Sequence, residues 1–420
     1  MVQVPIPRLG TTRSLFSLAD GPCKIRRHNW KIGKALEEST VTEIATRPSG
    51  TYDRLGIRRI INASATLTRL GGSIMPREVR EAMVEAGDSF VDVVDLQRAV
   101  SAHLAELTHN EAAYVPSGAA AGLTLVTAAL ITGTDPVKAE RLPLPDGPNY
   151  DMLIHKSQRF GYDHAIRMVG VNLVEFGVGS GAQEWELEAA YSDRTIGVIF
   201  LAGLVNEERA LPIETVIASA HRHNVPVIVD AAAQIPPPEN LWRFTRDLGA
   251  DIVIFSGGKG LRGPQPTGLV LGKKSIIDGI YVNASPNANI GRPMKVGKEE
   301  LAGIDAAVEL YLRQDHKAEL ARYEAIVQEI VGAFEGKRPG VTARRDFPSE
   351  AGQPHPRALI AIDSAIVGKD ADAVVHELID GEPAIAVSRG RAGLFLNPQT
   401  LQDEEVPIVI RRLREVLGIR

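Results

Sequence analysis

The chain has 420 residues, 44% of them hydrophobic and 24% charged, which is enough to bury one large core and a second, smaller one. Its net charge of −5 gives no global attraction for polyphosphate, and no apolar run reaches the roughly 18 residues of a membrane helix, so neither nucleic acid nor a membrane is an expected partner. The single cysteine, Cys23, excludes an intramolecular disulfide framework and a cysteine-built metal cluster, so no metal is expected and a reducing, cytoplasmic setting fits.

Residues 1–50 show no clear hydrophobic period and carry more basic than acidic side chains. A short basic stretch of this kind is usually a solvated tail, so we predict an N-terminal extension that is mobile or packs on a partner. Residues 51–300 are expected to form a large α/β domain, because from about residue 110 apolar strands alternate with helices. The expected strands are 112–115, 152–154, 171–176, 196–201, 225–229 and 252–254. The expected helices are 119–130, 162–169, 185–191 and one before Asp230 that places residues 213, 216, 217 and 220 on one face.

Residues 301–420 are expected to hold a connecting helix and a smaller C-terminal α+β domain. Apolar residues recur at helical spacing from 301 to 334, which predicts one long amphipathic helix. Beyond it the pattern predicts short strands at 357–362, 384–387 and 394–396, with helices at 371–378 and 404–417.

Two of the apolar runs end in an ionisable residue. The run 225–229 continues into Asp230, and the run 252–254 continues into a glycine-rich turn that carries Lys259. Open α/β sheets bind ligands at the carboxyl ends of their strands. At such an edge an amine can form a Schiff base with the aldehyde of pyridoxal 5'-phosphate, and a carboxylate can keep the pyridine nitrogen protonated. The two residues therefore predict a pyridoxal phosphate site.

A phosphate site is predicted where the strand 112–115 gives way to the helix at 119. Ser117 and Gly118 stand at this junction, and the residues that follow are small, so an anion can approach the free N–H groups of the helix N-terminus. Taken alone, Ser117 is equally well explained as a helix cap. A nucleotide-binding P-loop is disfavoured around Lys259, because that motif requires Ser or Thr after the lysine and Gly260 follows it.

At this point the chain resembles a known family. The stretches 114–121, 230–234 and 256–265, together with 62–72, look like those of the selenocysteine synthase-like group of fold-type-I pyridoxal phosphate enzymes. That group contains the bacterial L-seryl-tRNA(Sec) selenium transferases and the D-glucosaminate-6-phosphate ammonia-lyases, and the chain looks most like the ammonia-lyases. The resemblance runs from about residue 61 to the C-terminus. It implies the fold-type-I transferase fold, with a large, mostly parallel sheet domain and a smaller C-terminal α+β domain.

The resemblance also implies roles for individual residues. Lys259 would be the Schiff-base lysine and the proton shuttle at the substrate α-carbon, and Asp230 would pair with the pyridine nitrogen. The residues implied for the phosphate are Ser117, Gly118, Ala119 and Ser256. Gln234 is a candidate partner for the phenolic oxygen of the cofactor, although a capping or packing role explains it as well.

The residue on the open face of the cofactor ring is expected from the segment 158–165. Histidine is the common choice in such folds, but at the position that matches, this chain offers Gln158 or Arg159. His155 and His164 lie nearby in the sequence, and a histidine on a helix is more often structural than functional.

The acidic groups of the substrate call for arginine, whose planar fork binds a carboxylate at two points. The candidates are Arg69, Arg292 and Arg391, each of which is also explained as a surface residue. Arg292 lies in the loop 285–295, which is rich in Asn, Pro and Gly. In this fold such loops often reach a partner subunit, so a homodimer or a higher homo-oligomer is expected.

Several functions remain open on this scaffold. The leading prediction is an ammonia-lyase that removes the β-hydroxyl of a 2-amino-3-hydroxy acid, such as the phosphorylated amino sugar acid D-glucosaminate 6-phosphate, and gives a 2-oxo acid and ammonia. The alternatives are a transferase of the L-seryl-tRNA(Sec) selenium type, an aminotransferase or racemase, and a regulatory protein that holds pyridoxal phosphate without turnover. The acidic balance of the chain argues against a tRNA substrate.

Overall fold

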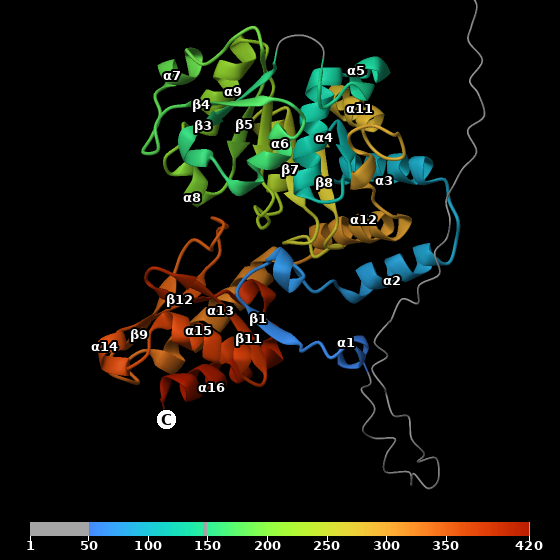
Figure 1. Cartoon of the computed structure of the whole chain (residues 1–420). Helices are drawn as coiled ribbons and strands as arrows, with labels where there is room; N and C mark the ends of the chain where they lie inside the picture. The colour runs from blue at the N-terminus through green and yellow to red at the C-terminus, as the bar shows by residue number, and fades with distance from the viewer. Residues whose placement is uncertain (1–49, 146–148, 420) are drawn as a thin grey trace, which may run out of the picture. The chain divides into compact units, whose positions relative to one another are not determined.

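A computed structural model describes residues 50–145 and 149–419 (Figure 1). The expectations for residues 1–49 lie outside this range. The chain divides into two compact units at Ile57 and Arg58. Of the first unit, the described part contains one single-turn helix, α1 (Thr51–Arg54). The second unit begins at Arg58 and holds both sheets and the candidate site. None of the described helices has both the length and the apolar character needed to cross a bilayer.

A seven-stranded sheet forms the centre of the larger domain, in the order β2-β8-β7-β6-β5-β3-β4. Neighbours from β4 to β7 run parallel, whereas β8 runs antiparallel to both β7 and β2. This confirms the expected fold class, a mostly parallel α/β sheet. The strands are β2 (Ala112–Tyr114), β3 (Asp151–His155), β4 (Asn172–Phe176), β5 (Thr195–Leu201), β6 (Val227–Asp230), β7 (Ile252–Ser256) and β8 (Gly268–Gly272).

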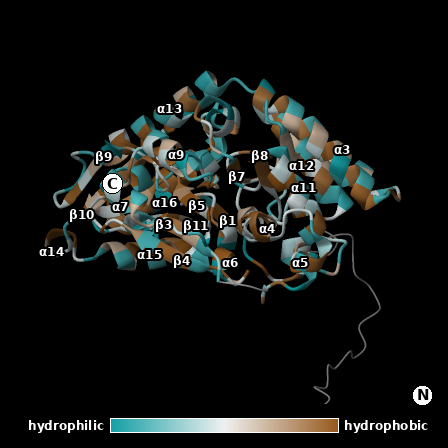
Figure 2. Ribbon diagram, turned by 90° about the horizontal axis from the view of Figure 1, so that it is seen from above, coloured by the Kyte–Doolittle hydropathy of each residue, from teal (hydrophilic) through white to brown (hydrophobic). Residues whose placement is uncertain are grey.

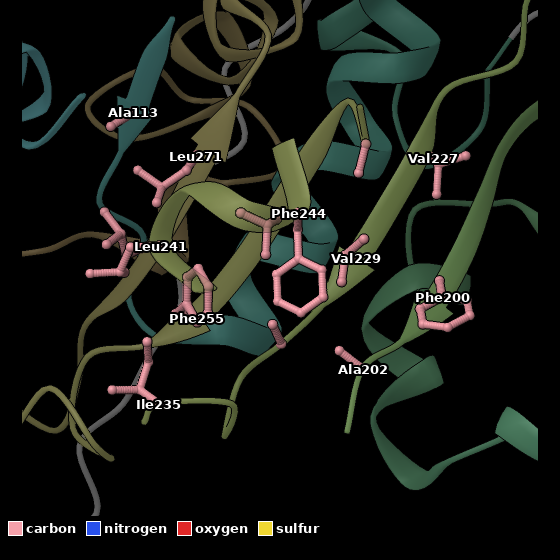
Figure 3. Packing of buried hydrophobic residues seen from close by; sticks show 14 of the residues in the cluster. Ala113, Phe200, Ala202, Val227, Val229, Ile235, Leu241, Phe244, Phe255 and Leu271 are labelled. Atoms are coloured by element: carbon pink, nitrogen blue, oxygen red, sulfur yellow. The ribbon is translucent and has the colours of Figure 1, made fainter. Parts of the chain in front are cut away.

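Helices cover both faces of this sheet, because the strands are apolar on both sides. Along β7, Val253 and Phe255 belong to one core layer, while Ile252 and Ile254 belong to the other. Figure 3 shows the first layer, in which Phe255 lies with Phe244. The helices of this domain are α2 (Arg77–Gly87), α3 (Val93–Leu107), α4 (Ala119–Thr132), α5 (Pro136–Glu140), α6 (His164–Arg167), α7 (Glu184–Glu188), α8 (Leu204–Glu207), α9 (Ile213–Arg222), α10 (Asn240–Trp242), α11 (Lys274–Asn283) and α12 (Lys298–Arg313). The short turns are the 3-10 helices η2 (Thr68–Leu70), η3 (Lys156–Gln158), η4 (Gly161–Asp163) and η6 (Arg292–Met294) and the π-helix η5 (Arg243–Asp247).

A five-stranded sheet in the order β1-β11-β12-β10-β9 forms the second domain and has its own core. Its first strand comes from the N-terminal side of the chain and pairs parallel with β11. The range expected for the larger domain therefore contributes a strand to the smaller sheet. The elements are β1 (Ile60–Ala63), β9 (Val341–Asp346), β10 (Arg357–Ile362), β11 (Ala384–Gly390), β12 (Gly393–Leu396), α13 (His316–Phe334), α14 (Ser364–Val367), α15 (Ala371–Asp380), η7 (Pro398–Thr400), η8 (Asp403–Glu405) and α16 (Val406–Leu417).

The single long helix expected over 301–334 is wrong. The chain forms α12 and α13 instead, with Gln314 in an extended conformation between them and the Asp315 side chain capping Ala318 N–H. The physical reason is that the apolar stripe serves two cores. Ile304 of α12 packs in the larger domain and Ile330 of α13 packs in the smaller one. In Figure 2 both helices show alternating hydrophobic and hydrophilic bands.

The segment after η2 is docked on the turn that follows β7. Ser73 N–H donates to the Gly258 carbonyl at 3.0 Å, and Ser73 Oγ donates to the Lys259 carbonyl at 2.6 Å. A methyl group on Gly72 would lie 2.5 Å from the Gly258 carbonyl oxygen, and Gly72 has a φ of +73°. Both the space and the backbone conformation therefore require glycine at this contact.

Alanine substitutions at Gly71 and Gly72 separate the effect of the backbone conformation from the effect of the limited space. Gly71 also has a positive φ, of +87°, but a methyl group there would meet nothing within 4 Å. We expect Gly71→Ala to lower the free energy of unfolding by about 1 kcal/mol through backbone strain alone. Gly72→Ala should lower it by about 3 kcal/mol, because the overlap with Gly258 adds to the strain. The midpoints of urea unfolding measure both, and equal losses would show that the contact with the turn contributes nothing.

Candidate active site

The carboxyl ends of β6 and β7 face a cavity of about 420 Å³. Three predicted segments meet there: the turn before α4, the end of β6 and the turn after β7. Its lining residues are Thr66, Thr68, Gly72, Ser117, Gly118, Ala119, Ala120, Leu123, Tyr162, Asp230, Ala232, Ser256, Gly258, Lys259, Gln265 and Pro266. The structure therefore brings together six residues that the sequence singled out, namely Lys259, Asp230, Ser117, Gly118, Ala119 and Ser256.

One end of the cavity is formed by the N-terminus of α4. Gly118 precedes the helix with a φ of +103°, a conformation that favours glycine. A methyl group on Gly268, in the neighbouring β8, would lie 2.7 Å from the Gly118 carbonyl carbon, so strand and turn are in close contact. The first N–H groups of a helix have no acceptor within it, and the first residues of α4, Ala119 and Ala120, line the cavity together with Ser117 and Ser256. This end suits a phosphate group.

Asp230 ends β6, where its register partner in β7 is Ile254. Its Oδ1 accepts a hydrogen bond from Ala232 N–H at 3.0 Å. Burial raises the pKa of the carboxyl, while the Ala232 N–H and the charge of Lys259 lower it. A carboxylate that is removed from water is stabilised by a cationic partner, such as a protonated ring nitrogen.

Lys259 reaches the same cavity from the turn after β7. Its carbonyl accepts from Ser73 Oγ at 2.6 Å and from Arg262 N–H at 3.0 Å, so the turn is held from two sides. Burial lowers the pKa of the amine, and the charges of Asp230 and Glu350 raise it. A lowered pKa makes a larger share of the amine neutral near pH 7, which is the form that attacks an aldehyde or accepts a proton.

Gln158 and Arg159 do not line the cavity. Gln158 is buried and pairs with the backbone of Leu201, donating from Nε2 to its carbonyl and accepting its N–H at Oε1, each at 3.0 Å. Arg159 forms ion pairs with Asp163 and Glu175. Tyr162, four residues beyond Gln158, is the one aromatic side chain among the described lining residues.

The side chains of Gln234, His155 and His164 also lie outside the cavity wall. The Gln234 amide is buried and donates to the Ala351 carbonyl at 2.7 Å, which ties the β6 end to the smaller domain. His155 contacts Ser157 Oγ through Nδ1 at 2.6 Å, and burial lowers its pKa. His164 is exposed beside Arg167. None of the three is among the described residues of the cavity wall.

The three candidate arginines lie outside this cavity. Arg69 and Arg391 are exposed. Arg292 lines a second cavity, of about 470 Å³, together with Arg98 and Lys295. Among the described lining residues that cavity contains no acid, and the first cavity contains no cation except Lys259. The groups that would bind the anionic parts of a substrate are therefore not assembled in the first cavity.

The sequence did not predict a role for some of the residues that line the cavity. Thr66, Thr68 and Gln265 occur in the stretches that carry the family resemblance, and Gln265 Nε2 donates to the Thr68 carbonyl at 2.8 Å, but no local pattern gave them a role. Glu350, on a loop of the smaller domain, is not among the lining residues, although its charge raises the pKa of the Lys259 amine. No motif or spacing marked it, because its relation to Lys259 exists only in the folded chain.

Comparison with known proteins agrees with this site. The family model described as SelA: L-seryl-tRNA selenium transferase matches residues 208–330, the part that contains Asp230 and Lys259. The chain is 31% identical over 377 residues to a 5'-C-glycyluridine monooxygenase-decarboxylase from a Streptomyces species, covering 87% of this chain and 92% of the relative. It is 29% identical over 373 residues to the D-glucosaminate-6-phosphate ammonia lyase of Salmonella typhimurium, covering 87% and 97%.

Comparison with a solved structure supports the same fold. The structure of a D-glucosaminate-6-phosphate ammonia-lyase superimposes with a TM-score of 0.77 at 28% sequence identity, covering 89% of this chain and 99% of that one. The relatives match nearly their whole length, and the resemblance that the sequence suggested is confirmed. The chain belongs to the selenocysteine synthase-like group of fold-type-I pyridoxal phosphate enzymes.

Proposed function

We propose that this protein is a pyridoxal phosphate-dependent ammonia-lyase. Its substrate would be a 2-amino-3-hydroxy acid, such as D-glucosaminate 6-phosphate, and its products a 2-oxo acid and ammonia. The observation that carries the proposal is the cavity in which Lys259, Asp230 and the N-terminus of α4 meet. The likeness to the Salmonella ammonia lyase in sequence, and to an ammonia-lyase in structure, supports this reaction.

The residues present fit three groups of the cofactor, namely its phosphate, its ring nitrogen and its aldehyde. Ser117, Gly118 and Ala119 would hold the phosphate with Ser256, and Asp230 would pair with the ring nitrogen. Lys259 would hold the cofactor covalently through its aldehyde. Tyr162 is better placed to pack against the ring than Gln158 or Arg159, because it lines the cavity.

When bound, the cofactor supplies an electron sink for the negative charge that develops at the substrate α-carbon. Lys259 Nζ would remove the α-proton, the bond between Cβ and the hydroxyl oxygen would break, and that oxygen would leave as water after taking up a proton. The unsaturated amine that is released hydrolyses in water to the 2-oxo acid and ammonia. The lowered pKa of Lys259 supports its role as the base.

A second candidate reaction follows from the Streptomyces relative, which is a monooxygenase-decarboxylase. By its name such an enzyme consumes dioxygen and releases carbon dioxide. Its identity to this chain is close to that of the ammonia lyase, 31% against 29%, so identity does not choose between them. A selenium transferase acting on tRNA is disfavoured, since the chain has 47 Lys and Arg against 52 Asp and Glu.

The anionic groups of the substrate would be bound with the help of a second copy of the chain. The first cavity has Lys259 as its one described cation, while Arg292 and Lys295 line a separate cavity free of described acids. Arg292 belongs to the loop 285–295, which in a homodimer would reach the partner subunit. Arg69 and Arg391 remain candidates on the exposed surface of the same chain.

The first prediction concerns the lysine. Full-length protein loaded with pyridoxal phosphate and reduced with borohydride should carry the label on the peptide that contains Lys259, since that amine is buried in the cavity and has a lowered pKa. Lys259→Ala should lose both the label and the activity. Lys274→Ala, which removes an exposed lysine paired with Asp278, is the matched control. Mapping of the label to another lysine would refute the assignment.

The second prediction concerns Asp230. Asp230→Asn keeps the shape of the side chain and removes its charge, so the ring nitrogen is no longer held protonated. We expect the cofactor to remain bound and turnover to fall about a hundredfold or more, on the order of 3 kcal/mol of transition-state stabilisation. Asp278→Asn, at a half-buried carboxylate that pairs with Lys274 outside the cavity, should have no effect. If turnover of Asp230→Asn stays near that of the native chain, Asp230 has no part in the reaction.

The third prediction separates the candidate reactions. With a panel of plain and phosphorylated 2-amino-3-hydroxy acids, the protein should release ammonia and 2-oxo acid in equal amounts, without RNA and without oxygen uptake. Arg292→Ala should raise the substrate concentration needed for half-maximal rate, because a cation that binds the substrate is lost.

Other outcomes of this assay have definite meanings. Oxygen uptake with release of carbon dioxide would favour the monooxygenase-decarboxylase, and an oxo acid without free ammonia would indicate an aminotransferase. Micromolar or tighter tRNA binding at physiological salt, with no product from any free amino acid, would favour the selenium transferase.

A further inference from the structure

Part of the wall of the first cavity consists of uncharged polar side chains that have no role in the proposed binding of the cofactor. Thr66 and Thr68 lie where the chain enters η2, and Gln265 lies on the turn between β7 and β8. Asp230 and Lys259 are the charged residues among the described lining residues, and both are assigned to the cofactor. The groups that this part of the wall offers to a substrate are therefore hydroxyl and amide groups.

The side chain of Gln265 is held in one orientation. A methyl group on Gly258 would lie 2.5 Å from Gln265 Cα, and one on Gly72 would lie 3.5 Å from Gln265 Cγ, so two turns pack against this residue. Gln265 Nε2 donates to the Thr68 carbonyl at 2.8 Å. Because a carbonyl can only accept, the amide nitrogen must face Thr68 and the amide oxygen Oε1 faces away from it. None of the described residues donates to Oε1, which leaves it to accept a hydrogen bond from a ligand.

The hydroxyl of Thr66 is also without a partner in the described part of the chain. Thr66 is 5% exposed, yet it lines the cavity. A hydroxyl that is withdrawn from water without a partner destabilises the folded chain, so this group is expected to meet a ligand or an ordered water in the cavity. Thr68 adds another hydroxyl closer to solvent, because that residue is exposed.

These groups suit the alcohols of a substrate better than its acids. A ligand hydroxyl both donates and accepts, so it can donate to Gln265 Oε1 while it accepts from a threonine hydroxyl. An ionised carboxylate or phosphate only accepts, and no cation except Lys259 occurs among the described lining residues to balance its charge. The anionic groups of a substrate are therefore not expected at this part of the wall.

We propose that Thr66 and Gln265, with Thr68 at the entrance, are specificity-determining residues that bind hydroxyl groups of the substrate beyond Cβ. The site would then favour a polyhydroxylated 2-amino-3-hydroxy acid over one with a plain alkyl chain of the same length. Discrimination of this kind is effective because a substrate without the hydroxyls leaves polar groups of the wall buried and unpaired. This inference rests on the proposed function, since it assumes that the substrate shares the cavity with the cofactor.

The test compares D-glucosaminate with 2-amino-3-hydroxyhexanoate of the same configuration at Cα and Cβ, which keeps the reacting groups and lacks the hydroxyls beyond them. Calorimetry measures the binding of both to full-length protein whose cofactor has been reduced with borohydride, so that no turnover occurs. The kcat/KM of both is measured on the unreduced holoenzyme. The native chain should bind D-glucosaminate about a hundredfold more tightly, since two hydrogen bonds contribute roughly tenfold each.

Thr66→Val keeps the shape of the side chain and removes its hydroxyl. Kd and KM for D-glucosaminate should rise about tenfold, while those for 2-amino-3-hydroxyhexanoate stay nearly unchanged. Tm should not fall, because the hydroxyl that is removed has no partner among the described residues. A residue with a purely structural role would lower Tm and leave the ratio of the two Kd values as it is.

Gln265→Met gives a second variant of similar length without the amide. It should lower the preference for D-glucosaminate in the same way and also lower Tm, because the hydrogen bond to the Thr68 carbonyl is lost. If this variant does not fold, Thr66→Val decides the test. The matched controls, Thr342→Val and Gln328→Met, change an exposed threonine and an exposed glutamine outside the cavity and should leave the preference unchanged.

The outcomes separate this inference from the proposed reaction. Equal affinity of the native chain for the two amino acids, or a preference that Thr66→Val does not lower, overturns the hydroxyl subsite even if ammonia is released from both. A preference that depends on Thr66, without release of ammonia from either compound, supports the subsite and contradicts the lyase reaction.

Discussion

The register of β6 against β7 is the constraint on which the rest of the site depends. Asp230 pairs with Ile254, so the acid is placed at the sheet edge from which the chain turns to Lys259. Both strands are buried on both faces, which leaves their carboxyl ends as the place where polar side chains can reach a ligand. The Ser73 contacts to Gly258 and Lys259 then fix the turn. Parallel pairing, an interaction of backbone groups, thereby sets the distance between the two ionisable groups.

The smaller domain adds a second constraint, because one of its loops contacts the larger domain. Its loop 347–356 is anchored inside that domain by Asn397 and on the larger domain by Gln234. Glu350 is therefore placed by two sets of contacts that belong to different cores. The break at Gln314 has the same origin, because α12 packs in one core and α13 in the other.

The family relation and the site geometry answer different questions. The two relatives match this chain over most of its length at similar identity, yet their names describe a lyase and a monooxygenase-decarboxylase. Cofactor chemistry is common to such enzymes, whereas the reaction depends on the groups that orient the substrate and direct protons. In this chain the cations of the second cavity, Arg98, Arg292 and Lys295, lie outside the four stretches that carry the family resemblance.

The sequence by itself determined the parts of the site that are local. Asp230, Lys259 and Ser117 each follow an apolar strand directly, so strand ends and turns were recognisable from neighbouring residues, and most strands of both sheets were placed correctly. The mostly parallel sheet followed from alternation of strand and helix.

Only the tertiary structure decided the rest. The entry of β1 into the smaller sheet, the break between α12 and α13, and the burial of Gln158 against Leu201 all depend on contacts between segments far apart in the chain. The hydrophobic period of a segment indicates which face of a helix or strand is buried. It does not identify the element against which that face packs. That partner is determined only when the two cores pack.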